Sequence, residues 1–238
     1  MAQFETDYLI VGAGAVGLAF ADTLIDEDPD CHITIVDKHA RPGGHWNDAY
    51  SFVKLHQPSA TYGVNSMELC PNRVDLHGHN KGMYPLASQS EILAYYERLM
   101  NDRLIPSGRV RYVPLAEYRE GHRIRSIFSG KEAPVTVRRK LVDATWFQTS
   151  VPSTHKPGFE IGEGARLAIP GDLPKLWREA GNLPDHYMVL GGGKTAMDTV
   201  VWLIEAGVDP DRIGWVRPRD SWMFNRRFLQ PAHAALDG

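Results

Sequence analysis

The sequence is poor in cysteine, has no excess of charge of one sign and contains no long uninterrupted apolar run. Only two of its 238 residues are cysteines, Cys31 and Cys70, and no C-x-x-C pair occurs. This composition excludes a disulfide framework and a redox-active dithiol. The formal net charge is −3 with both signs mixed along the chain, so the sequence offers no basic stripe for nucleic acid and no polybasic patch for a membrane.

Targeting and metal-binding patterns are also missing. The apolar N-terminal run has no basic leader and is broken by glycines and by Asp22, which is unlike a signal peptide or a membrane span. The closest histidine pair, His77 and His79, lacks further ligands at metal-site spacing, and we interpret it as loop polarity. We therefore expect a cytoplasmic protein without a bound metal.

What the sequence does contain is a strand, a glycine turn, a helix and a second strand between residues 7 and 38. An apolar run at residues 8–11 stops at Gly12-Ala13-Gly14-Ala15-Val16-Gly17. A helical stretch at residues 18–25 and a β-rich run at residues 33–36 follow, and the second strand ends at Asp37. This order is typical of a mononucleotide-binding βαβ unit.

Each glycine of this turn has a separate role in that interpretation. Gly12 allows a tight turn, Gly14 lets the backbone approach a pyrophosphate, and Gly17 lets the helix pack on the strands. The helix N-terminus offers N–H groups to the phosphates. Asp37, 25 residues after Gly12, can accept hydrogen bonds from an adenosine ribose. An ordinary glycine-rich turn is the alternative, which the matching distances of strand, helix and acid disfavour.

The segment after Asp37 has the composition of a packed, ligand-lining loop. Nearly forty residues rich in Pro, Gly, Asn and His precede the next helix, and aromatic residues are frequent among them. Gly43 and Gly44 can bring backbone close to a flat ring system, and Trp46 can stack on it. A simple turn beside a core tryptophan explains this segment equally well.

The middle of the chain predicts one helix and several strands. The helix runs from about residue 89 to residue 103 and opens with a capping box formed by Ser88 and Glu91. Short strands are expected at residues 110–113, 123–128, 135–137 and 141–144. The last of these returns to the main sheet, with its end near the nucleotide crevice, and Arg138-Arg139-Lys140 is expected at a solvated strand edge. Residues 149–186, rich in Pro and Gly, predict a connector between two folded units.

The opening pattern then returns. A strand at residues 187–190 leads into Gly191-Gly192-Gly193-Lys194-Thr195-Ala196, a helix and a second strand at residues 213–216. The place of the terminal acid is taken by Arg217, 26 residues after Gly191. Because an acid suits a ribose 2′-OH and an arginine suits a 2′-phosphate, Arg217 and Arg219 favour NADPH over NADH. Two surface arginines around a Pro218 turn remain the alternative.

With two such units, the sequence resembles the two-dinucleotide-binding-domain flavoproteins, in particular the flavin-containing and Baeyer-Villiger monooxygenases. The resemblance covers both glycine turns, Asp37 with the Gly-Gly-x-Trp segment, residues 55–58 and the capped helix. It implies an α/β fold of two Rossmann-like units with parallel sheets flanked by helices, plus a small β-meander in the first. Residues 1–160 are expected to form an FAD-binding domain and residues 161–238 an NAD(P)-binding domain. Both are expected to be incomplete, because family members return to the FAD domain whereas this sequence ends about 20 residues after Arg217.

The resemblance implies FAD and NADP as cofactors and an NADPH-dependent oxidoreductase, of monooxygenase type, acting on a small molecule. The alternative is a truncated or non-catalytic dinucleotide-binding module, whereas a dehydrogenase would need only one site. The sequence assigns no catalytic residue, no substrate and no oligomeric state. The residues implied to contact FAD are Gly12, Ala13, Gly14, Ala15, Val16, Gly17, Asp37, Lys38, Gly44, His45, Trp46, Gln57 and Thr145. Those implied to contact NADP are Gly191, Gly193, Lys194, Thr195, Arg217 and Arg219.

Two positions depart from the family pattern. The segment Phe159-Glu160-Ile161-Gly162-Glu163-Gly164 lacks the histidine of the monooxygenase fingerprint, and Ala144-Thr145-Trp146 stands where Ala-Thr-Gly is usual.

Overall fold

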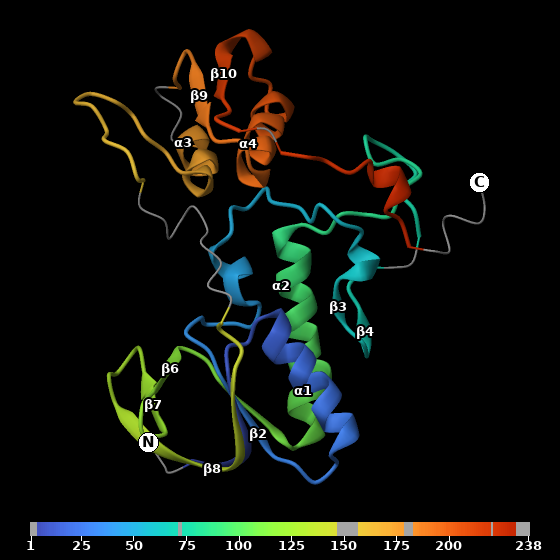
Figure 1. Ribbon diagram of the computed structural model, residues 1–238, viewed down its shortest axis with the longest axis vertical. Helices are drawn as coiled ribbons and strands as arrows, with labels where there is room; N and C mark the ends of the chain where they lie inside the picture. Colours follow the sequence, from blue (N-terminus) through green and yellow to red (C-terminus); the bar gives the residue numbers. More distant parts are fainter. Residues whose placement is uncertain (1–3, 71–72, 147–156, 179–182, 220, 232–238) are drawn as a thin grey trace.

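A computed structural model describes residues 4–70, 73–146, 157–178, 183–219 and 221–231 (Figure 1). Its larger sheet has six strands in the order β5-β2-β1-β8-β7-β6. β1 (Phe4–Val11) is parallel to β2 (Ile33–Val36) and to β8 (Glu132–Asp143), and β2 is parallel to β5 (Val110–Val113). β6 (Ala116–Arg119) and β7 (Arg123–Ser126) add an antiparallel extension to β8. This confirms the predicted α/β class and the β-meander of the first unit.

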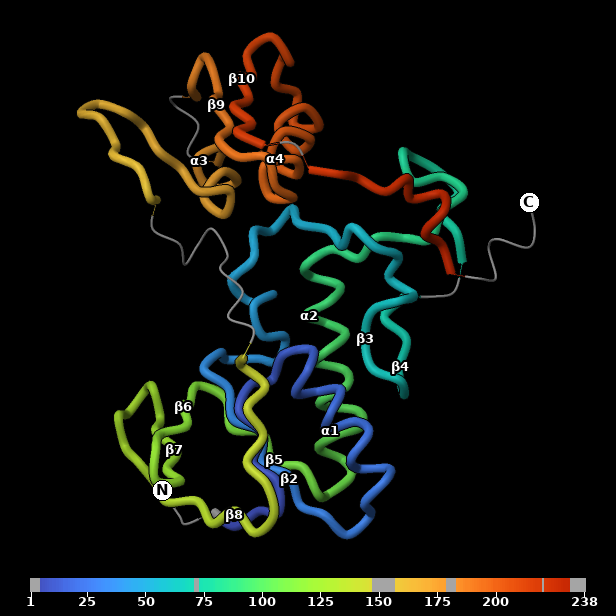
Figure 2. The backbone as a smooth tube through the Cα atoms, in the orientation of Figure 1, coloured from blue at the N-terminus to red at the C-terminus, as the bar shows by residue number. Residues whose placement is uncertain are grey.

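Two helices lie side by side along this sheet, α1 (Ala15–Glu27) and α2 (Gln89–Arg98) (Figures 1 and 2). Their apolar faces share one core with the parallel strands, and the side chains of Leu18, Ile35 and Ile92 are fully buried in it. α2 opens with the predicted capping box, in which Ser88 and Glu91 each satisfy a backbone amide of the other. The sheet and both helices therefore fix where the first glycine turn lies.

The predicted helical segment, from residue 89 to about residue 103, is confirmed in its extent, but its last part is not an α-helix. α2 ends at Arg98, a wider π-helical turn follows at Leu99–Leu104, and a 3-10 turn at Ile105–Ser107 closes the segment. Pro106 has no amide hydrogen to give to a carbonyl one turn back, so the helix cannot continue through it. The chain turns away at Gly108, whose φ of +72° is costly for any other residue.

The strand predictions between residues 109 and 145 were partly wrong. The two runs predicted at residues 135–137 and 141–144 belong to one strand, β8, and β6 was not predicted. Arg138, Arg139 and Lys140 are exposed and lie beyond the part of β8, residues 132–134, that pairs with β7, so the predicted solvated strand edge is confirmed. The charges of the two arginines are accommodated by acids, since Arg138 donates to Asp7 (2.9 Å from Nε) and Arg139 pairs with Asp28.

The loop after β2 is packed, as its composition predicted. It contains 3-10 turns at Gly44–Asp48 and Ser59–Thr61 and a hairpin of β3 (Gly63–Val64) and β4 (Met67–Glu68). Tyr50, Val53 and Leu55 are all buried in the main core.

The second unit repeats the first on a smaller scale. β9 (Tyr187–Leu190) and β10 (Ile213–Val216) are parallel, and α4 (Lys194–Glu205) connects them, followed by a 3-10 turn at Pro210–Arg212. The expected connector, residues 149–186, lies partly outside the described residues. Its described part is more than a linker, because a 3-10 turn at Pro170–Asp172 leads into a short helix, α3 (Leu173–Arg178). The high proline content of this segment is the reason why the helix was not predicted.

The last described segment runs from the second unit back to the first (Figure 1, red). Its 3-10 turn, Arg226–Phe228, places Arg226 Nη1 2.7 Å from Asn80 Oδ1, and Gln230 Oε1 accepts a bond of 2.8 Å from the amide of Tyr84.

Candidate functional site

The first glycine turn forms a tight corner between β1 and α1. Gly12 has a φ of +106°, and its amide donates to the carbonyl of Val36 at 2.8 Å, which ties the end of β1 to the end of β2. A Cβ on Gly17 would lie 2.1 Å from the Gly12 carbonyl oxygen, so only glycine fits there. α1 begins at Ala15 with Gly14 as its cap. Among the described residues no side chain caps these first amides, which suits the approach of an anionic ligand.

A second glycine pair packs against this corner. The amide of Gly43 donates to the carbonyl of Ala13 at 2.8 Å. A Cβ on Gly44 would lie 2.9 Å from the Cα of Gly14, so the two backbones touch. The sequence predicted separate roles for Gly14 and Gly44, and the structure brings them together. This contact leaves a backbone cradle in which a pyrophosphate can approach main-chain amides.

Asp37 lies at this corner, buried, at the end of β2. Its Oδ2 accepts a hydrogen bond of 2.6 Å from the amide of Ala13, and its Oδ1 accepts from the amide of His39 at 2.7 Å. The ring of His39 bridges two acids, with Nδ1 2.8 Å from Asp37 Oδ1 and Nε2 2.9 Å from Asp48 Oδ2. Each carboxylate oxygen has two lone pairs, so Asp37 keeps acceptor capacity for a ribose.

The charges of Asp37, His39 and Asp48 stabilise one another. Burial raises the pKa of Asp37, but the hydrogen bonds from His39 and Ala13 outweigh burial and hold this pKa below its usual value. The bond to Asp37 raises the pKa of His39 above the ordinary histidine value, with Asp48 adding to the effect. Sequence reasoning missed His39, because nothing in the turn pattern distinguishes it from a surface histidine.

The structure also places the remaining residues that the resemblance assigned to FAD. Trp46 is buried, and its Nε1 donates to Tyr62 Oη at 2.7 Å, as expected for a core tryptophan. The end of β8 meets the first turn, since a Cβ on Gly12 would lie 3.1 Å from Thr145 Cγ2. The nearby Trp146, in the place of the usual glycine, is 84% exposed. Of the others, Val16, Lys38 and His45 are exposed, and Gln57 is half-buried just before the turn at Ser59–Thr61.

The second glycine turn repeats the geometry of the first. Gly191 has a φ of +124°, and its amide donates to the carbonyl of Val216 at 2.9 Å. Gly193 caps α4, which begins at Lys194. This repetition confirms the predicted internal repeat in three dimensions.

Both predicted arginines lie beside this turn. The guanidinium carbon of Arg217 is 4.8 Å from the ring centroid of Trp215, whose Nε1 donates to the Gly191 carbonyl at 2.7 Å. A Cβ on Gly192 would lie 2.3 Å from the carbonyl oxygen of Arg219. A guanidinium at the end of the second strand is in the position where a 2′-phosphate is recognised in such folds.

The helix of the second unit contacts the loop of the first unit. Lys194 pairs with Asp198 one turn further along α4, and Tyr50 Oη donates to Asp198 Oδ2 at 2.8 Å. Phe52 stacks on Trp202 with ring centroids 4.8 Å apart and an interplanar angle of 18°. The spacing of Lys194 and Asp198 could have revealed their pairing, whereas no sequence signal connects Tyr50 to Asp198.

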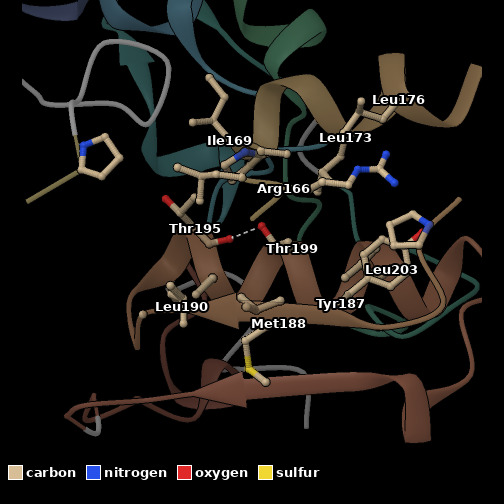
Figure 3. A pocket seen from close by; sticks show the side chains of 18 of the residues that line it. Arg166, Ile169, Leu173, Leu176, Tyr187, Met188, Leu190, Thr195, Thr199 and Leu203 are labelled. Atoms are coloured by element: carbon tan, nitrogen blue, oxygen red, sulfur yellow. Dashed lines mark hydrogen bonds between the residues drawn. The ribbon is translucent and has the colours of Figure 1, made fainter. Parts of the chain in front are cut away.

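A cavity of about 980 Å³ opens beside the second turn. Figure 3 shows Ile169, Leu173 and Leu176 facing the side chains of α4 and β9. Phe159 and Gly164 of the fingerprint segment also line it, together with Gly191 and Thr195 of the turn. The lining is largely apolar, and it includes the cationic side chain of Arg166.

Two further properties concern metals and membranes. Within the described ranges, no three His, Cys, Asp or Glu side chains lie close enough to hold a metal ion. Across the same part of the chain, no helix has the length and apolar character needed to cross a bilayer.

Comparison with known proteins places these features in context. Residues 10–74 match the family described as NAD(P)-binding Rossmann-like domain. An uncharacterized protein of Mycobacterium tuberculosis is 46% identical over 227 residues, which make up 95% of this chain and 41% of the relative. An FAD-dependent monooxygenase of Pyrenophora dematioidea is 28% identical over 222 residues, 88% of this chain and 39% of the relative. The chain thus spans about two fifths of the length of these curated relatives.

Solved structures extend the comparison to fold. A flavin-containing monooxygenase from Stenotrophomonas maltophilia matches 93% of this chain and 60% of its own, with a TM-score of 0.57 and 17% identity. Cyclohexanone monooxygenase from Rhodococcus sp. Phi1 bound to NADP+ matches 91% of this chain and 38% of its own, with a TM-score of 0.50 and 19% identity. The resemblance seen in the sequence is therefore confirmed: residues 10–74 are similar to the NAD(P)-binding Rossmann-like domain, and the chain shares the fold of flavin monooxygenases and Baeyer-Villiger monooxygenases.

Proposed function

We propose that this chain is the nucleotide-binding part of an NADPH-dependent FAD oxidoreductase of monooxygenase type. The observation that carries the proposal is the pair of like-built glycine corners, one with Asp37 and the other with Arg217 at the end of its second strand. One nucleotide site would serve a dehydrogenase, whereas a flavoenzyme reduced by a nicotinamide nucleotide needs two. The curated relative described as an FAD-dependent monooxygenase, 28% identical, and the NADP+ of cyclohexanone monooxygenase support this choice.

The first corner fits FAD by its backbone. The glycine contact between Gly14 and Gly44 keeps side chains out of the cradle, and the free amides at the start of α1 would bind the pyrophosphate. Asp37, with its pKa lowered, is ionised, and the remaining lone pair on its Oδ2 can accept a hydrogen bond from a ribose hydroxyl. Thr145, beside Gly12, would border the same crevice.

The second corner fits NADPH by charge. Arg217 and Arg219 would contact the 2′-phosphate, and Lys194 with Thr195 at the start of α4 would contact the pyrophosphate. Bound FAD would accept a hydride from the nicotinamide and supply the redox chemistry. The residues of this chain bind and orient the two nucleotides. The substrate would be a small organic molecule, and the apolar cavity beside the second turn is compatible with an apolar group.

A spectroscopic experiment tests the proposal. The purified chain is reconstituted with FAD, and the visible flavin spectrum is followed while NADPH is added without oxygen. We expect a protein-bound flavin whose spectrum bleaches on reduction. A matched variant, Gly44→Val, fills the first cradle and should bind no flavin, while Gly171→Val, where an added Cβ meets nothing within 4 Å, should behave as the parent. A chain that binds no flavin under these conditions would contradict the proposal.

A further inference from the structure

The lysine of the second glycine turn is already engaged by an acid. Lys194 is the first residue of α4, and its ammonium pairs with Asp198 one turn along the same helix. Lysine at this place is the natural partner of a nucleotide phosphate. A phosphate that approaches the turn therefore meets a cation whose charge is partly satisfied by Asp198.

Asp198 in turn accepts a hydrogen bond from a residue of the first unit. The hydroxyl of Tyr50 lies 2.8 Å from Asp198 Oδ2, the same oxygen that Lys194 contacts. Burial, and then the charge of Asp198, raise the pKa of Tyr50. The hydroxyl thus stays protonated and can donate to Asp198. Thr195, the next residue of the turn, also lies beside this hydroxyl.

Tyr50 is placed by contacts that begin at the first corner. The 3-10 turn Gly44–Asp48 starts against Gly14, and Tyr50 follows it two residues later. Tyr50 is buried at 6% exposure and packs on Phe52, whose ring stacks on Trp202 of α4. The blue loop that carries these residues lies beneath α4 in Figure 1. Main-chain and side-chain contacts therefore run from one glycine corner to the other.

We propose that Asp198 competes with the phosphate of the nucleotide for Lys194. We also propose that Tyr50, from the first unit, weakens this competition through its hydrogen bond to Asp198. The nucleotide's phosphate must draw Lys194 away from Asp198. Tyr50 makes this easier, because its hydrogen bond satisfies the carboxylate that Lys194 leaves behind. The inference rests on the proposed function only in taking the second corner as a site for a nicotinamide nucleotide.

Two substitutions then have opposite effects on NADPH binding. Asp198→Asn removes the competing charge, so NADPH should bind tighter, by up to about fivefold, the range for one partly exposed ion pair. Tyr50→Phe removes only the hydroxyl. Asp198 then has Lys194 as its remaining partner and holds it more strongly, so NADPH should bind more weakly, by roughly two- to fivefold. In the Asp198→Asn background, Tyr50→Phe should have no further effect.

Matched controls separate this effect from general damage. Tyr112→Phe also removes a buried hydroxyl, one with no hydrogen-bond partner among the described residues, and should leave NADPH affinity unchanged. Asp211→Asn removes an exposed charge from the turn before β10 and should do the same. Thermal melting of every variant reports whether the fold is retained.

A second readout does not depend on nucleotide binding. The rate at which an acylating reagent modifies Lys194, followed by peptide mass spectrometry on the full chain, should rise in Asp198→Asn and fall in Tyr50→Phe. If no variant binds NADPH but the rates change in this way, the proposed function fails and the competition stands. NADPH affinities that change in the same direction in both variants, or Lys194 rates that equal those of the controls, would overturn the inference.

Discussion

His39 Nδ1 lies 2.8 Å from Asp37 Oδ1, so the acid that ends the first βαβ unit is paired with a histidine two residues further on. The other ring nitrogen of His39 reaches Asp48 at the end of the turn that begins with Gly44. The histidine therefore fastens the Gly-Gly-His-Trp segment to the strand end against which the ribose of FAD would lie. A structural role of this kind explains a histidine that the dinucleotide pattern does not require.

This pairing predicts a pH dependence of stability. The folded-state pKa of His39 is raised above the unfolded value of about 6.5. The stabilisation is thus fully present below about pH 6.5 and is lost as the pH rises through the folded-state pKa. Urea unfolding from about pH 6 to about pH 9 should show a free energy of unfolding that falls in the parent and is flatter in His39→Gln. His77→Gln should keep the parental slope, and a His39→Gln slope equal to it would contradict the assignment.

The close packing at the first turn predicts a severe effect of one methyl group. A Cβ on Gly17 would lie 2.1 Å from the Gly12 carbonyl oxygen, which only a shift of α1 could relieve. Gly17→Ala should lower the free energy of unfolding by roughly 1–3 kcal/mol, as for overpacked cores, and should abolish FAD binding. Gly171→Ala, with open space around its Cβ, serves as the control in denaturant titrations. A Gly17→Ala chain that binds FAD like the parent would show that α1 does not start where the structure has it.

A buried ion pair between α1 and the π-helical turn Leu99–Leu104 predicts a second stability effect. The Asp22 side chain is 2% exposed and accepts a bond of 2.6 Å from Arg103 Nε. Arg103→Met should cost about 3 kcal/mol, near the low end for leaving a buried charge unpaired, because Ser66 still donates to the carboxylate. Arg119→Met breaks an exposed pair with Glu117 and should cost at most about 0.5 kcal/mol. Equal losses in denaturant titrations would show that the Asp22 pair contributes no more than a surface pair.

The local parts of this fold were readable from the sequence, and the non-local parts were not. The turn at Gly12 and the capping box at Ser88 follow from backbone rules that act within a few residues, and the structure confirms them, whereas α1 begins at Ala15, before the predicted start at residue 18. The unbroken β8 was missed because its charged centre resembles a surface turn until Asp7 on the neighbouring strand is in place. For the site, the glycine contact of Gly14 with Gly44 depends on how the loop after β2 folds back.

The same reasoning explains why the contact between the two units could not be foreseen. Tyr50 and Asp198 are 148 residues apart in the chain, and neither belongs to a motif. Asp198 could have been paired with Lys194 from its spacing of four residues on a helix. Its second partner, Tyr50, becomes visible only when the two units are packed together.

The arginine of the second corner predicts the choice between nicotinamide nucleotides. Arg217→Ala removes the cation nearest the position of a 2′-phosphate, so NADPH affinity should fall by roughly ten- to a hundredfold, the worth of a hydrogen bond to a charged group. NADH affinity should change little. Fluorescence titrations with both nucleotides measure the ratio, and Arg212→Ala, an exposed arginine before β10, is the matched control. Equal losses of affinity for NADPH and NADH would contradict a contact between Arg217 and the 2′-phosphate.

The central claim is that one chain presents two separate nucleotide corners, the first for FAD and the second for NADPH. Equilibrium dialysis of the full chain against FAD and NADP+ together tests this claim most directly. The account predicts one FAD and one NADP+ bound per chain at the same time, with neither displacing the other. Mutual displacement, or saturation at a single nucleotide per chain, would contradict it.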